Sequence, residues 1–304
     1  MSGRGSGLCL TASASVLWGT VFVAANIGLQ YTNAYILVFV RFMLATTAIA
    51  FLAIVFNRSL SVTGELRKGS IWLLGAIDAS GFLLQYVGQS LTNASDATML
   101  ANLAPVLVPL VAWGISRESI SKLQGIAMLL GFSGLTLMAS PNGRFHGTGV
   151  LGDMLLFGAS ISFAFFIVLS KRLNAVSTGS ALAVIVTITI FLAPAAFLFG
   201  KLNPLSTGIS LEVWYSSLYM GIICTVIPMV LYLRGLRSIS SSESGTLLLV
   251  EMLSGLILSA SLLGQMLTER ELVASIAIAA ALGMGVGFKQ NCRMIHRLLR
   301  QNHA

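Results

Sequence analysis

Three ionisable side chains lie deep inside long apolar segments of the sequence: Arg41, Asp78 and Glu251. A charge at the centre of a membrane-spanning helix costs roughly 2.5 to 3.5 kcal/mol on insertion scales, so it usually pairs with a polar group or lines a polar pathway. The three residues therefore predict a charge network. It either recognises a zwitterion or carries a proton, or it is a static ion pair, such as Arg41 with Asp78, that fixes the register of two helices.

The composition around these residues is that of a multi-pass membrane protein. Of 304 residues, 56% are hydrophobic and only 9% are charged, with a mean hydropathy of +0.89. Soluble domains carry about 25% charged residues, and a spanning helix needs about 20 apolar residues. The predicted fold class is all-α, with ten transmembrane helices at 8–30, 34–56, 70–91, 94–115, 123–140, 150–170, 180–200, 211–233, 242–263 and 272–288.

The positive charges fall mainly on one side of the predicted membrane. All but four of the 18 Lys and Arg residues lie on the side that holds both chain ends; the exceptions are Arg41, Arg144, Lys201 and Arg270. The positive-inside rule then places both termini in the cytoplasm, and the expected location is a plasma or inner cell membrane. Because the location of the charges explains the net charge of +8, no nucleic-acid partner is predicted. The basic tail 289–304 is expected to be attracted to anionic membrane lipid.

The sequence also contains a weak internal repeat. Segment 95–105 recurs at 242–252, and each copy belongs to a set of five predicted spans. Because five is odd, the second set enters the membrane from the opposite face, an arrangement of secondary transporters that bind substrate between the halves. The expected units are a first five-helix repeat at 1–141, a connecting loop at 142–149, a second repeat at 150–288 and a basic tail at 289–304.

Several short motifs make the chain similar to the EamA-type drug/metabolite transporter superfamily, which has ten helices. They are Leu17-Trp18-Gly19, Arg41-Phe42, the segment 102–106, the turn at 118–121 and Gly152-Asp153. The resemblance covers almost the whole chain and implies a helical transporter of small metabolites. The second copy departs from the family pattern at Met252, where a proline is usual, and at Gln265, where a glutamate is usual.

Polar residues share helical faces in the predicted spans. Asp78, Gly81, Gln85 and Gln89 lie on one face, which either lines a wet cavity or packs through hydrogen bonds. Asn102 and Pro105 share a face of the next span. Proline leaves a backbone carbonyl without its usual N–H donor, which either accompanies a kink that serves packing or provides a carbonyl that contacts substrate. We expect a substrate-binding group and a gating or charge-network group. The first comprises Trp18, Asn26, Asp78, Gln85 and Asn102, and the second Arg41, Glu251, Pro105 and Pro228.

The sequence lacks the motifs of metal or nucleotide chemistry. His146, His296 and His303 lie outside the spans, and there is no His-Glu-x-x-His or phosphate-binding glycine motif. Cys9, Cys224 and Cys292 are too widely spaced for a zinc site. Neither a catalytic residue, a cofactor nor a metal is predicted.

The favoured function is a secondary transporter or facilitator of small organic metabolites, of the amino-acid or drug/metabolite efflux type, that alternates access between the repeats. A proton is a candidate coupling ion. The alternatives are an intramembrane enzyme acting on lipid, with Asp78 and Glu251 as acid and base, and a non-transporting scaffold.

One further pattern concerns the last predicted span. Small residues recur every four positions at Ser275, Ala279, Gly283 and Gly287. Such a stripe lets helices approach closely. Internal packing is the favoured interpretation, and a homodimer through this span is the alternative.

Overall fold

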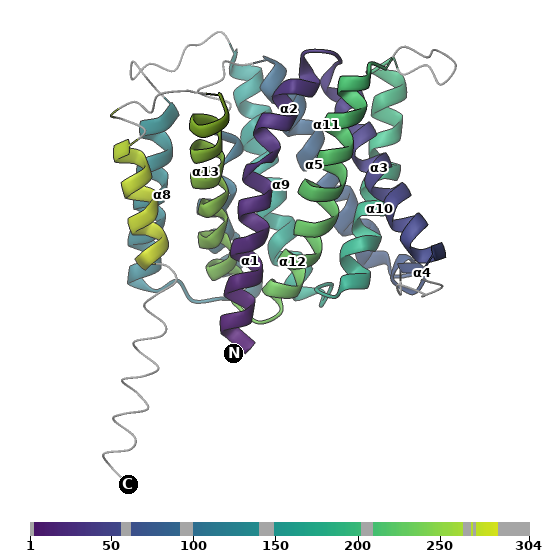
Figure 1. The fold of residues 1–304 in the computed structure, drawn as a ribbon. Helices are drawn as coiled ribbons and strands as arrows, with labels where there is room; N and C mark the ends of the chain where they lie inside the picture. Colours follow the sequence, from purple (N-terminus) through teal and green to yellow (C-terminus); the bar gives the residue numbers. More distant parts are fainter. Residues whose placement is uncertain are drawn as a thin grey trace.

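The computed structural model describes residues 3–55, 62–91, 100–139, 149–201, 209–263, 269 and 272–284. Every regular element in these ranges is a helix, and the long helices run side by side across the thickness of the molecule (Figure 1). Five of them are long and apolar enough to cross a membrane: 34–52, 69–91, 150–172, 178–198 and 211–236. The protein is therefore an all-helical, multi-pass membrane protein.

The helices of the first half begin at Gly3. They are α1 (Gly3–Gly19), α2 (Val21–Leu29), α3 (Ala34–Val55), the short α4 (Val62–Leu66), α5 (Gly69–Leu91), α7 (Ala104–Ser116) and α8 (Lys122–Ala139).

The second half contains a helix that changes its hydrogen-bonding pattern part-way along. That helix runs through α11 (Leu211–Gly221), the π-helical turn η2 (Ile222–Val226) and α12 (Ile227–Leu236). The other elements of the second half are α9 (Val150–Arg172), α10 (Thr178–Leu198), α13 (Ser241–Leu263) and the helix Leu272–Met284.

Three expected spans differ from the structure in their boundaries or continuity. The first span begins at residue 3 and is interrupted at Thr20, whose hydroxyl donates to the Leu17 carbonyl at 2.8 Å. In the fourth, the helix breaks before α7, which has Pro105 in its first turn, where a missing N–H costs nothing. The eighth has a π turn ahead of Pro228.

The two halves interlock rather than forming separate bodies. α1 packs on α12 and α13, α5 on α9 and α10, α3 on α10 and α11, and α7 on α9 and α13. Each of these contacts joins a helix of the first half to one of the second. The centre of the molecule is consequently enclosed by helices of both halves.

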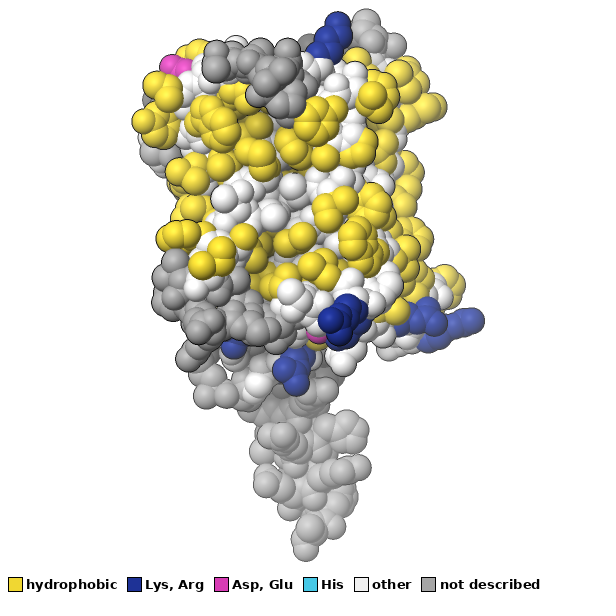
Figure 2. All heavy atoms as spheres, turned by 90° about the vertical axis from the view of Figure 1, so that its right-hand side faces the viewer, with side chains coloured by type: hydrophobic (Ala, Val, Ile, Leu, Met, Phe, Trp, Pro, Cys, Tyr) yellow, Lys and Arg dark blue, Asp and Glu magenta, His cyan; other side chains and the backbone are white. Residues whose placement is uncertain are grey.

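The outer surface fits a lipid environment. Large apolar side chains are exposed on the sides of the bundle, for example Phe51 at 63% and Ile54 at 78%. Figure 2 shows hydrophobic side chains over much of one side and most of the visible basic side chains at the end where the N-terminus lies. The short helix α4 lies at that end (Figure 1), and the two basic residues that follow it, Arg67 and Lys68, are exposed.

The internal-packing interpretation of the last span is wrong at Gly283. This residue is exposed, and a Cβ added there would meet no atom within 4 Å. The buried face carries Ala274, Ile278 and Ala281 instead, and Ile278 lies against Gly134 of α8. Helical spacing identifies residues that share a face, but it does not tell which face points inward. Gly287 lies outside the described residues, and the homodimer stays a prediction.

Candidate functional site

A cavity of about 130 Å³ lies at the centre of the molecule, between the halves. Its wall includes residues from α1, α2, α3, α5, α7, α9, η2, α12 and α13. The volume holds several water molecules or a small organic ligand. Its polar side chains include Arg41, Asp78, Gln85, Tyr86, Asn102 and Glu251.

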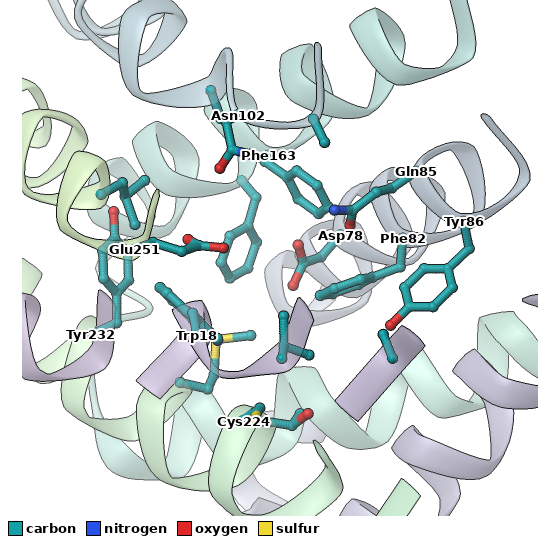
Figure 3. A pocket seen from close by; sticks show the side chains of 18 of the residues that line it. Trp18, Asp78, Phe82, Gln85, Tyr86, Asn102, Phe163, Cys224, Tyr232 and Glu251 are labelled. Atoms are coloured by element: carbon teal, nitrogen blue, oxygen red, sulfur yellow. The ribbon is translucent and has the colours of Figure 1, made fainter. Parts of the chain in front are cut away.

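Two carboxyl groups in this wall have no hydrogen-bond or ion-pair partner among the described residues. Asp78 is 2% exposed, and its Oδ2 has no hydrogen bond within the described part of the chain. The Glu251 carboxyl likewise has no hydrogen bond there, and no Lys or Arg nitrogen of those residues lies within 4.0 Å of either carboxyl. Figure 3 shows both groups directed into the same space, Asp78 from α5 and Glu251 from α13.

Arg41 is held by neutral groups. Its Nε donates to Thr225 Oγ1 at 2.8 Å, its Nη1 to Tyr86 Oη at 3.2 Å, and its Nη2 to the Cys224 carbonyl at 2.9 Å. The rings of Phe42 and Phe82 both lie with their centroids 5.3 Å from its Cζ. The proposed static ion pair between Arg41 and Asp78 is therefore not formed in this structure.

The local fold of η2 explains why acceptors face Arg41. Pro228 has no N–H, so it cannot donate to the carbonyl four residues earlier, that of Cys224. Arg41 donates to this carbonyl instead. The adjacent Thr225 hydroxyl donates to the Met220 carbonyl at 2.8 Å, which leaves its oxygen free to accept from Arg41. Pro228 itself is buried in α12 and does not line the cavity.

A helix break places Asn102 in the wall. The chain is helical at residues 100 and 101, and α7 starts at Ala104. Ser160 of α9 donates to the Leu100 carbonyl at 2.5 Å, so the second half satisfies backbone that the break exposes. Irregular backbone at membrane depth is tolerated where it is buried in protein or lines a cavity.

Aromatic rings form much of the remaining wall. The Trp18 and Tyr232 rings lie 5.1 Å apart, and the Phe82 and Phe163 rings lie 5.2 Å apart in an edge-on arrangement. Gly19 lets α1 approach α13, because a Cβ there would lie 2.5 Å from the Glu251 carbonyl oxygen. The cavity thus combines carboxyl groups with aromatic faces.

Comparison with known proteins identifies the family. The model of the EamA-like transporter family matches residues 5–140 and again residues 150–285. The chain belongs to the EamA-like transporter family. It is a membrane transporter built from two copies of the family's repeat.

The relatives carry no substrate in their names. An "Uncharacterized transporter" of Archaeoglobus fulgidus is 30% identical over 247 residues, which cover 77% of this chain and 81% of that protein. "Uncharacterized transporter YetK" of Bacillus subtilis is 23% identical over 283 residues, covering 90% and 83%. A solved crystal structure has the same fold, with a TM-score of 0.79 at 18% identity over 95% of this chain and 99% of that chain.

In this EamA-like transporter, most of the predicted site residues meet in one wall. The cavity is lined by Trp18, Arg41, Asp78, Gln85, Asn102, Pro105 and Glu251. The backbone of Asn26 belongs to α2, but its side chain lies outside the described part of the structure. Their functional roles stay predictions.

Sequence reasoning missed several wall residues of the transporter. Thr225 and Cys224 had a signal, because they lie just before Pro228, whose ring frees a carbonyl. Tyr86 follows Gln85 directly. For Phe163 and Phe166 there was no signal in the sequence, since aromatic residues in membrane helices usually pack against neighbouring helices. Among the described residues, no group of three His, Cys, Asp or Glu side chains is placed to hold a metal ion.

Proposed function

We propose that the protein is a secondary transporter or facilitator that moves small organic metabolites through its central cavity. Access would alternate between the two sides as the inverted repeats, with ten spans in all, rock against each other. The observation that supports this most is the position of the cavity, whose polar wall is built by helices of both halves. A change in packing between the halves would therefore change which side the cavity faces.

Polar contacts between the halves at the N-terminal end support a conformation closed on that side. Glu118, which follows α7, accepts hydrogen bonds from the hydroxyls of Ser241 and Ser242 at 2.9 and 3.3 Å, at the start of α13. Lys171 of α9 forms an ion pair with Glu118 at 3.8 Å. Arg4 of α1 pairs with Glu243 of α13 at 2.8 Å. We call Glu118, Lys171, Ser241 and Ser242 the inner clamp.

A second hollow supports an approach to the cavity from the other end. It measures about 330 Å³, is lined by Asn33 and Tyr35 among others, and shares Tyr86 and Gln89 with the central cavity. Tyr86 is held by its hydrogen bond from Arg41. In the proposed cycle Tyr86 and Gln89 separate the two spaces, and release of the inner clamp exposes the cavity to the cytoplasm.

The proposed orientation has both termini in the cytoplasm of a plasma or inner cell membrane. Most of the basic side chains visible in Figure 2 lie at the end where the N-terminus lies, which is the cytoplasmic end under the positive-inside rule. A reporter at Ala304 should give a cytoplasmic signal and one in the loop 142–148 an external signal. The reverse pattern, or the same side for both, would contradict the topology.

Within this function, substrate contact is assigned to Trp18, Asn26, Asp78, Gln85 and Asn102. Arg41, Glu251, Pro105 and Pro228 set the charge and shape of the site. A proton bound by a carboxyl of the cavity is the proposed coupling ion. A homodimer would use the exposed face of the Leu272–Met284 helix, where Gly283 lies.

Transport by the purified protein tests the proposal. Liposomes containing it are loaded with a mixture of small metabolites, and the compounds released are identified by mass spectrometry, with protein-free liposomes as control. Lipid turnover is followed in the same samples. Protein-dependent release with unchanged lipid supports a transporter. Modified lipid without release would favour the intramembrane enzyme, and neither result would favour the scaffold.

A further inference from the structure

The charged groups of the cavity wall are not equally available to a ligand. Each nitrogen of the Arg41 guanidinium donates a hydrogen bond to a protein acceptor, and the adjoining rings of Phe42 and Phe82 lie close to the group. Asp78 and Glu251 have no such partners among the described residues. A ligand entering the cavity therefore finds two carboxyl groups without partners among the described residues, and a cation that already donates three hydrogen bonds to the protein.

The balance of charge points the same way. With both carboxyls ionised and Arg41 protonated, the wall carries one net negative charge, which one monovalent cation neutralises. A buried carboxylate without a partner is unfavourable, and a bound cation relieves that cost. A zwitterion would bring a carboxylate as well, and the cation of the described wall, Arg41, already donates from each of its three nitrogens to protein acceptors.

The walls suit a cation that is also apolar. Figure 3 shows Trp18, Phe82 and Phe163 around the space into which the two carboxyl groups point. The faces of aromatic rings attract cations, and the quaternary ammonium group is the ligand best known for this contact. At about 130 Å³ the cavity limits the ligand to a small molecule.

We propose that the cavity selects a small organic cation, an amine or quaternary ammonium compound, with Asp78 and Glu251 as its counter-charges and the rings of Trp18, Phe82 and Phe163 as its walls. This inference rests on the proposed function, since it names the substrate class of the same cavity. It makes Asp78 and Glu251 determinants of specificity that act together from the two halves of the chain.

Four probes of nearly the same shape test the choice of charge. They are choline as the cation, 3,3-dimethylbutanol as its uncharged isostere, glycine betaine as the zwitterion and 3,3-dimethylbutanoate as the anion. Binding to the purified wild-type protein in detergent is measured by thermal shift, in which a ligand of the folded state raises the melting temperature. The expected result is a rise with choline that exceeds the rise with each of the other three.

Substitutions then assign the effect to the carboxyl groups. Asp78→Asn and Glu251→Gln keep the shape and remove the charge, and each should weaken choline binding about tenfold or more, or about 1.4 kcal/mol. The matched control is Glu212→Gln, at an exposed carboxyl in the first turn of α11. It should bind choline as the wild type does. If a cavity variant does not fold, the four-probe comparison on the wild type still decides the charge preference.

Several outcomes would overturn the inference. They are a preference for betaine, for the anion or for the neutral alcohol, no binding of any of the four probes, or unchanged choline affinity in both folded cavity variants. Each of these leaves the transporter proposal intact if the loaded liposomes release metabolites. Conversely, choline binding without release of any metabolite would support the cation site and contradict the proposed transport.

Discussion

Thr225→Val probes how Arg41 is held inside the membrane. The substitution keeps the size of the side chain and removes the oxygen that accepts the Nε hydrogen bond at 2.8 Å. Thr225 and Arg41 are each 3% exposed, so bulk water does not reach them to replace the lost acceptor. The guanidinium would keep its bonds to Tyr86 and Cys224 but leave one donor unsatisfied.

The expected loss follows from the charge of the donor. Hydrogen bonds between side chains of membrane helices average about 0.6 kcal/mol, with a maximum near 1.7. Bonds to charged groups are stronger, about 1.5 to 3 kcal/mol. Because the stranded donor belongs to a cation, we expect the free energy of unfolding to fall by about 1.5 to 3 kcal/mol.

Thr11→Val is the matched control. Thr11 is fully buried, and its hydroxyl oxygen has no hydrogen-bond partner within the described residues. The same chemical change there should leave stability unchanged or slightly raised. Unfolding is followed by SDS titration of the protein in mixed micelles. Equal stability of the two variants would refute the assignment of Thr225 as a partner of the Arg41 cation.

Asp78→Asn distinguishes this arrangement from an ion pair. If Arg41 paired with Asp78, the change would strand a buried cation and lower the free energy of unfolding by about 3 to 5 kcal/mol. The observed hydrogen bonds instead predict that Asp78→Asn keeps wild-type stability while transport is lost or uncoupled. A large loss of stability that Arg41→Gln restores would show that the ion pair forms.

Two further changes test the packing and the clamp. Gly19→Ala would place a Cβ 2.5 Å from the backbone oxygen of Glu251 and should cost about 1 to 3 kcal/mol, seen as a lower melting temperature. Gly283→Ala, which meets open space, is its control, and equal melting of both would contradict the close approach. Glu118→Gln should loosen the inner clamp and speed labelling of a Gln85→Cys thiol from the cytoplasmic side, in a variant without the native cysteines. Labelling as slow as with the native Glu118 would argue against the clamp.

The sequence was informative about helices and inward faces. Expected span 34–56 closely matches α3 (Ala34–Val55), because a long apolar run has only one stable form in a membrane. The polar face of α5 could be read from its spacing, and Asp78, Gln85 and Gln89 do line the cavity. Helical periodicity places such residues in a common direction, and lipid on the other side makes that direction inward.

The partners of Arg41 could not be read in the same way. Thr225 lies 184 residues further along the chain, and its orientation depends on a π turn that has no clear sequence signature. Depth alone suggested pairing with Asp78, but depth does not give the direction in which a side chain leaves its helix. For the same reason the small-residue stripe at Gly283 was assigned to the wrong face.

Blocking the cavity tests the central claim most directly. Gln85→Trp would fill the space between the halves without changing its charge, while Phe51→Trp, at an exposed side chain of α3, adds the same ring outside it. Counterflow of the released metabolite is measured in liposomes containing equal amounts of folded protein. The account predicts loss of counterflow in Gln85→Trp and a wild-type rate in Phe51→Trp. A wild-type rate in a folded Gln85→Trp protein would contradict it, because the substrate would then pass by another route.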